Sequence, residues 1–186
     1  EGKNLIDFYG GRKDIENNQL RLIGKPKVRF KEDPIRILRA IRFSAKLNMK
    51  IHEDTLNEIK DSLNLLKSVP YSRLFDEVMK LFLTGHAQKS MALFKKYNLC
   101  SMYFPSLENE NKIYNNFLTQ GLINTDFRIK NQKTVNPGFL LATFLWQDVL
   151  ELWKKNKKNY PHPSLSLDKA IEDTFKKQTR IFPIQK

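Results

Sequence analysis

The side chains best suited to specific chemistry lie together between residues 32 and 46. Glu32 and Asp33 precede Arg36 and Arg39 at helical spacing. A carboxylate accepts hydrogen bonds and a guanidinium donates them in a planar fork, so Asp33 and Arg36, one helical turn apart, can together address the hydrogen-bonding edge of a base. The pair also has a plainer interpretation, in which Asp33 only caps a helix and Arg36 is a solvated surface residue.

The same segment predicts a basic helix face that includes an aromatic ring. At about 100° per residue, four cations fall together on one face: Arg36, Arg39, Arg42 and Lys46. Phe43 lies angularly between Arg36 and Arg39, and an aromatic ring beside positive charge suits a base and a phosphate together. A separate face carries the apolar residues Ile37, Leu38, Ile41 and Ala45, which should enter the core.

Helical periodicity begins after Pro26 and continues almost to the end of the chain. The helix with the basic face should run from Asp33, as its N-cap, through Pro34 to about Leu47. Three more helices should follow: one from Asp54 or Thr55 through Leu66, one from Ser72 to Thr84, and one from Ala87 to Tyr97. Gly85 is placed to end the third of these four helices in the left-handed conformation.

The C-terminal part should form a second helical lobe. The polar, Asn-rich stretch from Ser106 to Asn136 predicts a flexible connection or a lobe boundary, with a short helix around Ile113 to Leu118. Pro137 opens an apolar helix through Trp153 that should be buried. A basic loop from Asn156 to Pro163 should then lead to a last helix, Asp168 to Lys177. The cations expected to contact a polyanion here are Lys154, Lys155, Lys157 and Lys158.

The N-terminal stretch differs from the rest. Short apolar pieces, Leu5-Ile6 and Leu20 to Ile23, flank Gly10-Gly11 and indicate extended segments joined by a turn. The expected fold is therefore mainly α, with helical lobes and a short β remnant at the N-terminus.

Charge and composition indicate the class of partner. The 186 residues include 33 Lys and Arg against 20 Asp and Glu, a formal net charge of +13 that favours a nucleic-acid partner. A Lys-rich surface that merely solvates the fold is the competing interpretation. The single cysteine, Cys100, allows no internal disulfide and fits a reducing cytoplasm. The longest apolar stretch is too short and polar to cross a membrane, and a start at Glu1 suggests a piece of a longer protein.

Three runs of sequence resemble one known family. They are Asp7 to Asp14 (DFYGGRKD), Leu20 to Gly24 (LRLIG) and Phe30 to Phe43 (FKEDPIRILRAIRF). These runs resemble the end of the head and the start of the neck in bacterial poly(A) polymerases and CCA-adding enzymes, which are class II nucleotidyltransferases. The resemblance covers nearly the whole chain. It implies a head remnant over residues 1–24, a helical neck over 25–105 and a truncated helical body over 106–186.

The resemblance also implies roles for individual residues. Asp33 and Arg36 would act as a protein template that selects the incoming nucleotide, supported by Glu32 and Arg39. Arg73 and Glu77, at i and i+4, would help to fix the template helix, although by default they are an exposed ion pair of small effect. Arg42 and Lys46, with the four lysines named above, would bind RNA.

The stretches Arg73 to Glu77, Lys80 to Ala87 and Val135 to Trp146 are more similar to the poly(A) branch than to the CCA branch. The resemblance then implies an enzyme that adds AMP from ATP to RNA 3′ ends without a nucleic-acid template. The Mg²⁺ ligands of that family lie in the part of the head that has no counterpart here, so this chain should hold no metal ligand or catalytic residue and should be inactive alone. A stand-alone basic RNA-binding module, such as a decayed-gene remnant, and a fragment of a CCA-adding tRNA nucleotidyltransferase remain as alternatives.

Overall fold

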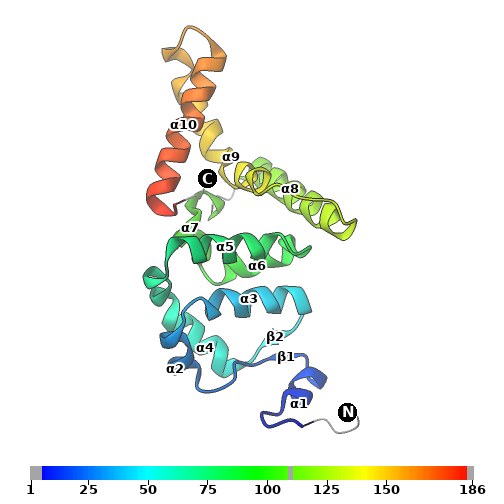
Figure 1. Ribbon diagram of the computed structural model, residues 1–186. Coiled ribbons are helices and arrows are strands. Elements are labelled where there is room, and N and C mark those ends of the chain that lie inside the picture. The colour runs from blue at the N-terminus through cyan, green and yellow to red at the C-terminus, as the bar shows by residue number, and fades with distance from the viewer. Residues whose placement is uncertain (1–5, 109–110, 184–186) are drawn as a thin grey trace. The chain divides into compact units, whose positions relative to one another are not determined.

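The protein is mainly α-helical, as its sequence predicts. A computed structural model describes residues 6–108 and 111–183, and Figure 1 shows their helices in chain order. The chain divides into two compact units, Glu1–Leu81 and Phe82–Lys186, called here the N-terminal and C-terminal units. The boundaries after residues 24 and 105, which concern the parts of an intact enzyme, stay predictions. No helix in the described ranges is long and apolar enough to cross a membrane.

The start of the N-terminal unit is organised by a helix and a parallel strand pair. Helix α1 (Gly11–Glu16) precedes strand β1 (Gln19–Leu20), which pairs in parallel with β2 (Lys50–Ile51). The prediction of two extended segments around Gly10-Gly11 is wrong at the glycines, because Gly10, with φ of 72°, leads directly into α1. Leu5 lies outside the described residues.

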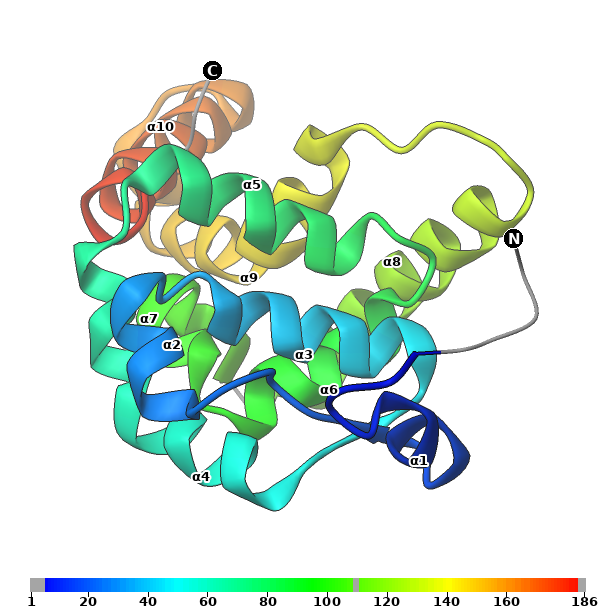
Figure 2. The same cartoon turned by 60° about the horizontal axis from the view of Figure 1, so that its bottom comes forward.

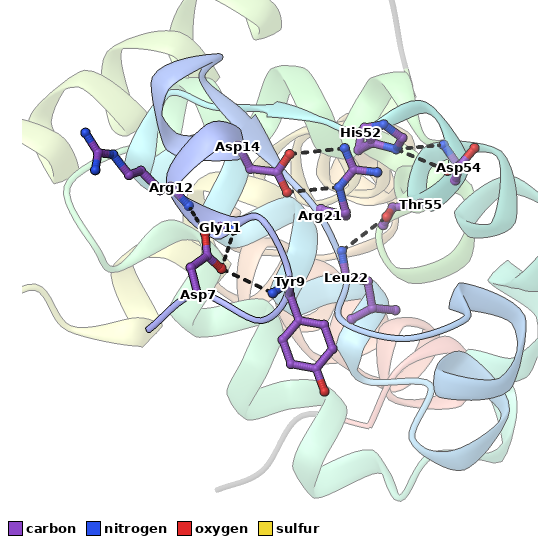
Figure 3. A network of polar contacts seen from close by, with 10 residues as sticks. All are labelled: Asp7, Tyr9, Gly11, Arg12, Asp14, Arg21, Leu22, His52, Asp54 and Thr55. Atoms are coloured by element: carbon purple, nitrogen blue, oxygen red, sulfur yellow. Dashed lines mark hydrogen bonds and ion pairs between the residues drawn. The ribbon is translucent and has the colours of Figure 1, made fainter. Parts of the chain in front are cut away.

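Two groups of hydrogen bonds fix this region, and Figure 3 shows both: one around Asp7 and one between Asp14 and Arg21. The Asp7 carboxylate accepts hydrogen bonds from the backbone N–H groups of Gly11 and Arg12, both at 2.9 Å. These N–H groups lower the pKa of Asp7. Asp14 accepts two hydrogen bonds from Arg21, at 2.9 and 3.1 Å, which tie α1 to the residue after β1.

Four helices and a 3-10 turn complete the N-terminal unit. They are α2 (Pro26–Glu32), α3 (Arg36–Leu47), α4 (Glu53–Ser62), η1 (Leu63–Ser68) and α5 (Tyr71–Phe82), the last of which ends at the unit boundary. Figure 2 shows α2 beside α4. The predicted core face of α3 is confirmed, since Ile37, Leu38 and Ile41 are fully buried.

The start of α3 differs from the prediction. The chain forms a separate helix, α2, that ends at Glu32, and Asp33 is the C-cap residue of α2 in an extended conformation. Helix α3 begins only at Arg36, and no side chain caps it. Asp33 was predicted to cap this helix, which is wrong because its carboxylate is engaged by an arginine of α5.

The C-terminal unit contains five helices in the described residues, of which the sequence prediction missed one and made three too short. Its first elements are α6 (Ala87–Lys96), α7 (Leu99–Tyr103), η2 (Pro105–Glu108) and α8 (Lys112–Lys130). Gly85, with φ of 80°, separates α5 from α6 as expected. The predicted flexible connection is wrong, since most of it is the long helix α8, whose start Asn111 caps.

The remaining helices enclose an aromatic core. Helix α9 (Pro137–Asn156) is followed by the 3-10 turn η3 (Lys157–Asn159) and by α10 (Pro163–Ile181), which packs along α9. The predicted burial of α9 holds for Leu140, Phe144 and Leu145. Rings of five phenylalanines and one tyrosine contact one another between helices: Phe82, Phe94, Tyr103, Phe104, Phe144 and Phe182.

Two close contacts lock α8 into the C-terminal unit. The carboxylate of the buried Asp126 accepts hydrogen bonds from Ala87 N at 2.6 Å and Gln88 N at 3.2 Å, and so caps α6 from a distant part of the chain. Gly121 lets α8 approach α9, because a Cβ there would lie 2.5 Å from Thr143 Cγ2.

Candidate nucleotide and RNA site

The turn between α2 and α3 positions the two neighbouring carboxylates. Arg36 N donates to Asp33 O at 3.2 Å, and Ile37 N donates to Pro34 O at 3.0 Å, so the backbone closes a tight connection here. Glu32 therefore ends one helix and Arg36 begins the next. Their side chains meet across the turn although they belong to different helices.

Arg36 is held by two acceptors at this turn. Its Nη1 donates to Glu32 Oε2 at 3.1 Å and to the carbonyl oxygen of Arg29 at 2.9 Å. Glu32 also accepts from Arg29 Nη1 at 2.6 Å, which fixes the carboxylate from the other side. The Arg36 side chain is 24% exposed, so part of its guanidinium faces solvent while the rest is fixed. Such a restrained donor is suited to recognising a partner, because little rotamer entropy is lost on binding.

Asp33 is held by α5 rather than by its own helix. Arg73 Nη2 donates to both carboxylate oxygens of Asp33, at 3.1 and 3.2 Å. The plainer alternative, an exposed ion pair between Arg73 and Glu77, is wrong because the two residues have different partners. A carboxylate oxygen can accept more than one hydrogen bond, so Asp33 keeps acceptor capacity beyond the contact with Arg73.

Glu77 forms the second link between α3 and α5. Its Oε1 accepts from Arg42 Nε at 2.5 Å, and the side chains of Arg42 and Glu77 are only 15% and 10% exposed. The Arg42 guanidinium also lies over the Phe43 ring, 4.6 Å from its centroid. Arg42 is therefore committed to α5 and Phe43, and its predicted contact with RNA stays a prediction.

Two hollows lie on this surface of the N-terminal unit. A cavity of about 350 Å³ is lined by residues of β1, α2, α3 and α4, among them Arg29, Arg36, Arg39 and Phe43. A second, of about 330 Å³, lies between α3 and α5 and is lined by charged side chains, including Arg39, Arg42, Arg73 and Lys80. Arg39 lines both cavities. The structure thus brings Arg36, Arg39 and Phe43 together around one space, as the helix face predicts.

The other predicted RNA-binding residues lie elsewhere. Lys46 is exposed in the last turn of α3. Lys154 and Lys155 belong to the last turn of α9, and Lys157 and Lys158 belong to η3, so the start of the predicted loop is a 3-10 turn. All four are exposed on the C-terminal unit, and Lys157 lies 5.8 Å from the centroid of the Trp153 ring.

Arg29 is a site residue that the sequence reasoning missed. It lines the same cavity as Arg36 and binds Glu32. Its spacing, three residues before Glu32 and seven before Arg36, was a usable signal, because helical neighbours recur at such intervals. Arg21 and Thr55, which also line this cavity, come from distant segments and carried no signal of that kind.

The described residues contain no group of three or more His, Cys, Asp or Glu side chains that could hold a metal ion. The carboxylates at the site, Glu32, Asp33 and Glu77, are instead each paired with an arginine. The geometry found here can bind and orient an anionic or hydrogen-bonding ligand. It does not fit a Mg²⁺ centre.

The chain is similar to known proteins along much of its length. Residues 48–111 match a family model described as "Probable RNA and SrmB-binding site of polymerase A". The chain is 40% identical over 154 residues to poly(A) polymerase I of Salmonella typhi, a match that covers 80% of this chain and 33% of the relative. It is 34% identical over 102 residues to a CCA-adding enzyme of Ligilactobacillus salivarius, covering 53% of this chain and 25% of that enzyme.

A solved structure shares the fold. A tRNA nucleotidyltransferase complexed with a primer tRNA and an incoming ATP analogue superposes with a TM-score of 0.60 at 29% identity, covering 76% of this chain and 42% of that one. The chain thus spans about a third of the length of the poly(A) polymerase that it matches.

Proposed function

Because the chain belongs to the class II nucleotidyltransferase and poly(A) polymerase family and spans about a third of the length of the poly(A) polymerase that it matches, we propose that it is the nucleotide-selecting and RNA-holding part of a poly(A) polymerase. The intact enzyme would add AMP from ATP to RNA 3′ ends without a nucleic-acid template. It would work in the cytoplasm.

One observation carries this proposal: the α2–α3 turn presents a carboxylate and a guanidinium that are each restrained by a separate partner. Arg73 holds Asp33, while Glu32 and the Arg29 carbonyl hold Arg36. A base needs both an acceptor and a donor in a fixed relation, and restraint of both groups lowers the entropy cost of reading it. We assign Asp33 and Arg36 to base selection, with Glu32, Arg73 and Glu77 as positioning residues. Arg39, which lines the wall of the cavity, is assigned a supporting role in base selection.

The RNA-binding part of the proposal rests on charge. Arg42, Lys46 and the lysines of α9 and η3 (Lys154, Lys155, Lys157, Lys158) would attract the RNA backbone, and a net charge of +13 supports this. Because the carboxylates Glu32, Asp33 and Glu77 are each paired with an arginine, the metal ions of nucleotidyl transfer would be held elsewhere than at this site. This chain would then orient the base of ATP and the primer strand.

A CCA-adding enzyme is the second candidate, and the site geometry suits it equally well. The longer and closer match to poly(A) polymerase I, 40% over 154 residues against 34% over 102, favours the poly(A) branch. A stand-alone RNA-binding module would use the same basic surface but would have no need for a restrained Asp33–Arg36 pair.

The test is base choice in an enzyme restored by joining this chain to a complete nucleotidyltransferase head. Arg36→Ala removes a donor to the base and leaves metal and triphosphate contacts in the head intact. The preference for ATP over CTP should fall by the equivalent of about 1 to 3 kcal/mol, the worth of a good polar contact to a base edge. The measurement is the ratio of ATP to CTP incorporation at matched primer concentration.

Lys31→Ala is the matched control, because Lys31 is an exposed cation next to Glu32 that lines neither cavity. It should keep the parent ratio, whereas Arg42→Ala should weaken primer binding with less change in base choice. If Arg36→Ala retained the ATP preference of the parent at full rate, the template role would be wrong and Arg36 would be a structural residue of the α2–α3 turn.

A further inference from the structure

The surface where α8 ends and α9 begins surrounds one hollow with aromatic and polar side chains. This hollow, of about 540 Å³, lies within the range of roughly 300 to 1,000 Å³ typical of small-ligand pockets. Two rings on its wall are unusually exposed for their type, Phe127 at 59% and Phe139 at 45%. The polar side chains on the wall include Asn124, Arg128, Lys133 and Asn136.

The segment that forms this hollow is mainly cationic. Residues 111–139 contain four cations, Lys112, Arg128, Lys130 and Lys133, but a single acid, Asp126. Asp126 is buried and caps the N-terminus of α6, so it does not offset the cations at the surface. Among the residues that the structure describes, no acidic side chain lines the hollow. Its potential is therefore positive, which attracts an anion and disfavours a cationic partner.

The wall of the hollow is held in place before any ligand binds. Helix α8 ends with Gln132 in the left-handed conformation, φ 55°, and Lys133 N donates to Arg128 O at 2.8 Å. The Arg128 guanidinium returns over this turn and donates through Nε and Nη2 to Thr134 O, at 3.0 and 2.9 Å. Because these hydrogen bonds hold the connection between α8 and α9 at both points, little conformational entropy is lost when a ligand binds.

The two helix ends at the hollow act differently on an anion. The C-terminus of α8 is the negative end of a helix dipole, but the turn at Gln132 satisfies the carbonyls of Arg128 and Ile129. The N-terminus of α9, capped by Asn136, contributes the positive end of a long helix. With Arg128 and Lys133 beside it, the positive contribution dominates.

We propose that this hollow binds one unstacked base of a single-stranded RNA, with the base against Phe127 and Phe139 and an adjacent phosphate at Arg128 and Lys133. Aromatic rings accept any base by stacking, and a guanidinium with an ammonium accepts a phosphate, so the site tracks the strand without strong sequence preference. The site lies outside residues 48–111 and on a different unit from the α2–α3 turn. This proposal rests on the proposed function in one respect, which is the choice of RNA as the anionic polymer.

A protein partner is the competing occupant, because exposed phenylalanines also occur at protein interfaces. Against it stands the composition of the wall, in which lysine and arginine occur without an acid and the hollow has the size of a nucleotide-binding pocket rather than of a broad flat face. Binding of one nucleotide needs only two rings that stack on its base and one contact with its phosphate. The observations therefore favour RNA.

The test measures binding of the 186-residue chain to a short oligoadenylate that carries one 2-aminopurine. Stacking should quench the 2-aminopurine fluorescence, and Phe127→Ala or Phe139→Ala should raise Kd about 5- to 100-fold and remove the quenching. Phe127→Trp should keep both. Lys133→Ala should lower the slope of log K against log salt by about 0.7, as expected for one phosphate contact to a single strand.

Ile113→Ala is the control, since Ile113 is an equally apolar residue of α8, 84% exposed and outside the hollow, and it should bind as the parent does. Circular dichroism checks that each variant is folded. The proposal is wrong if both Phe→Ala variants bind within twofold of the parent. It is equally wrong if they instead abolish self-association seen by sedimentation, since the surface is then a protein interface. No nucleoside triphosphate is used, so failure leaves the template role of Arg36 untouched.

Discussion

The link between α3 and α5 depends on a nearly buried ion pair whose removal has a calculable cost. Arg42→Ala would leave Glu77, whose side chain is 10% exposed, without its guanidinium partner. Removing one member of a fully buried pair costs about 3 to 5 kcal/mol, because the remaining charge stays desolvated. Since both side chains retain some solvent contact, we expect a smaller loss, about 2 to 3 kcal/mol.

Urea unfolding followed by far-ultraviolet circular dichroism measures this loss. With a denaturant slope of roughly 2 kcal/mol per molar, the midpoint of the transition that includes α3 should fall by about 1 M. The exposed pair Arg12–Glu16 supplies the control, because its side chains are 73% and 61% exposed and Arg12→Ala should not move the midpoint measurably.

A double variant separates the ion pair from simple loss of packing. Arg42→Met with Glu77→Leu replaces both charges by apolar side chains of similar length, and it should recover most of the stability lost in Arg42→Ala. The reasoning would be refuted if Arg42→Ala changed stability by less than about 0.5 kcal/mol, the usual range of surface substitutions. It would also be refuted if the separate losses of Arg42→Met and Glu77→Leu simply added in the double variant, because additivity means no coupling.

Three further predictions concern other parts of the chain. Gly121→Ala should destabilise the C-terminal unit by about 1 to 3 kcal/mol in a thermal or urea transition, because the new Cβ would lie 2.5 Å from Thr143 Cγ2, and Thr143→Ala should restore part of the loss. The hydrogen bonds from Arg21 lower the pKa of Asp14 below its unfolded value, so the stability they give is present at neutral pH and is lost as pH falls through the folded pKa. The protection of the α1 amides, which is the intrinsic exchange rate divided by the measured rate at the same pH, should therefore fall in acid, and Asp14→Asn should abolish that pH dependence. The chain alone should not incorporate labelled AMP from ATP and Mg²⁺ into an RNA primer, and any such incorporation would contradict the assignment of the metal site to residues outside it.

The elements that the sequence predicted well carry both a periodic apolar face and a terminal signal. Helix α6 ends within one residue of the prediction, and α9 begins at the predicted Pro137, because proline at the first helical position and an Asn before it are local signals. The core face of α3 also followed from spacing alone. In these cases the local preference and the tertiary fold agree, so no distant information was needed.

Helix α8 was predicted too short, around Ile113 to Leu118 instead of Lys112–Lys130, because its apolar residues lie on more than one face. Leu118 and Leu122 are buried, while Ile113, Phe117 and Phe127 are exposed, so the periodicity expected of an amphipathic helix is weak. Its polar, Asn-rich composition then resembled a loop. The hollow beside it depends on how Arg128 bends back to Thr134, which no spacing rule encodes.

The roles of Asp33, Arg36 and Arg39 in base selection stay predictions, whereas the structure gives their pairings, which the sequence did not indicate. The partner of Asp33 is Arg73, forty residues away. A carboxylate before a helix is most often a cap, and only the position of α5 decides otherwise. Ion pairs between distant helices are set by the fold as a whole, so the sequence could indicate the chemistry and not the contacts.

The cap that Asp126 places on α6 limits where the chain can be cut. Residues 48–111 match a family model as one segment, yet the carboxylate that satisfies Ala87 N and Gln88 N comes from beyond its end. An excised peptide ending at 111 would leave those amides to water and remove the helix against which α6 packs. The segment that matches the family model and the segment that can fold alone therefore have different boundaries in this protein. A minimal folded piece that includes α6 must extend through α8.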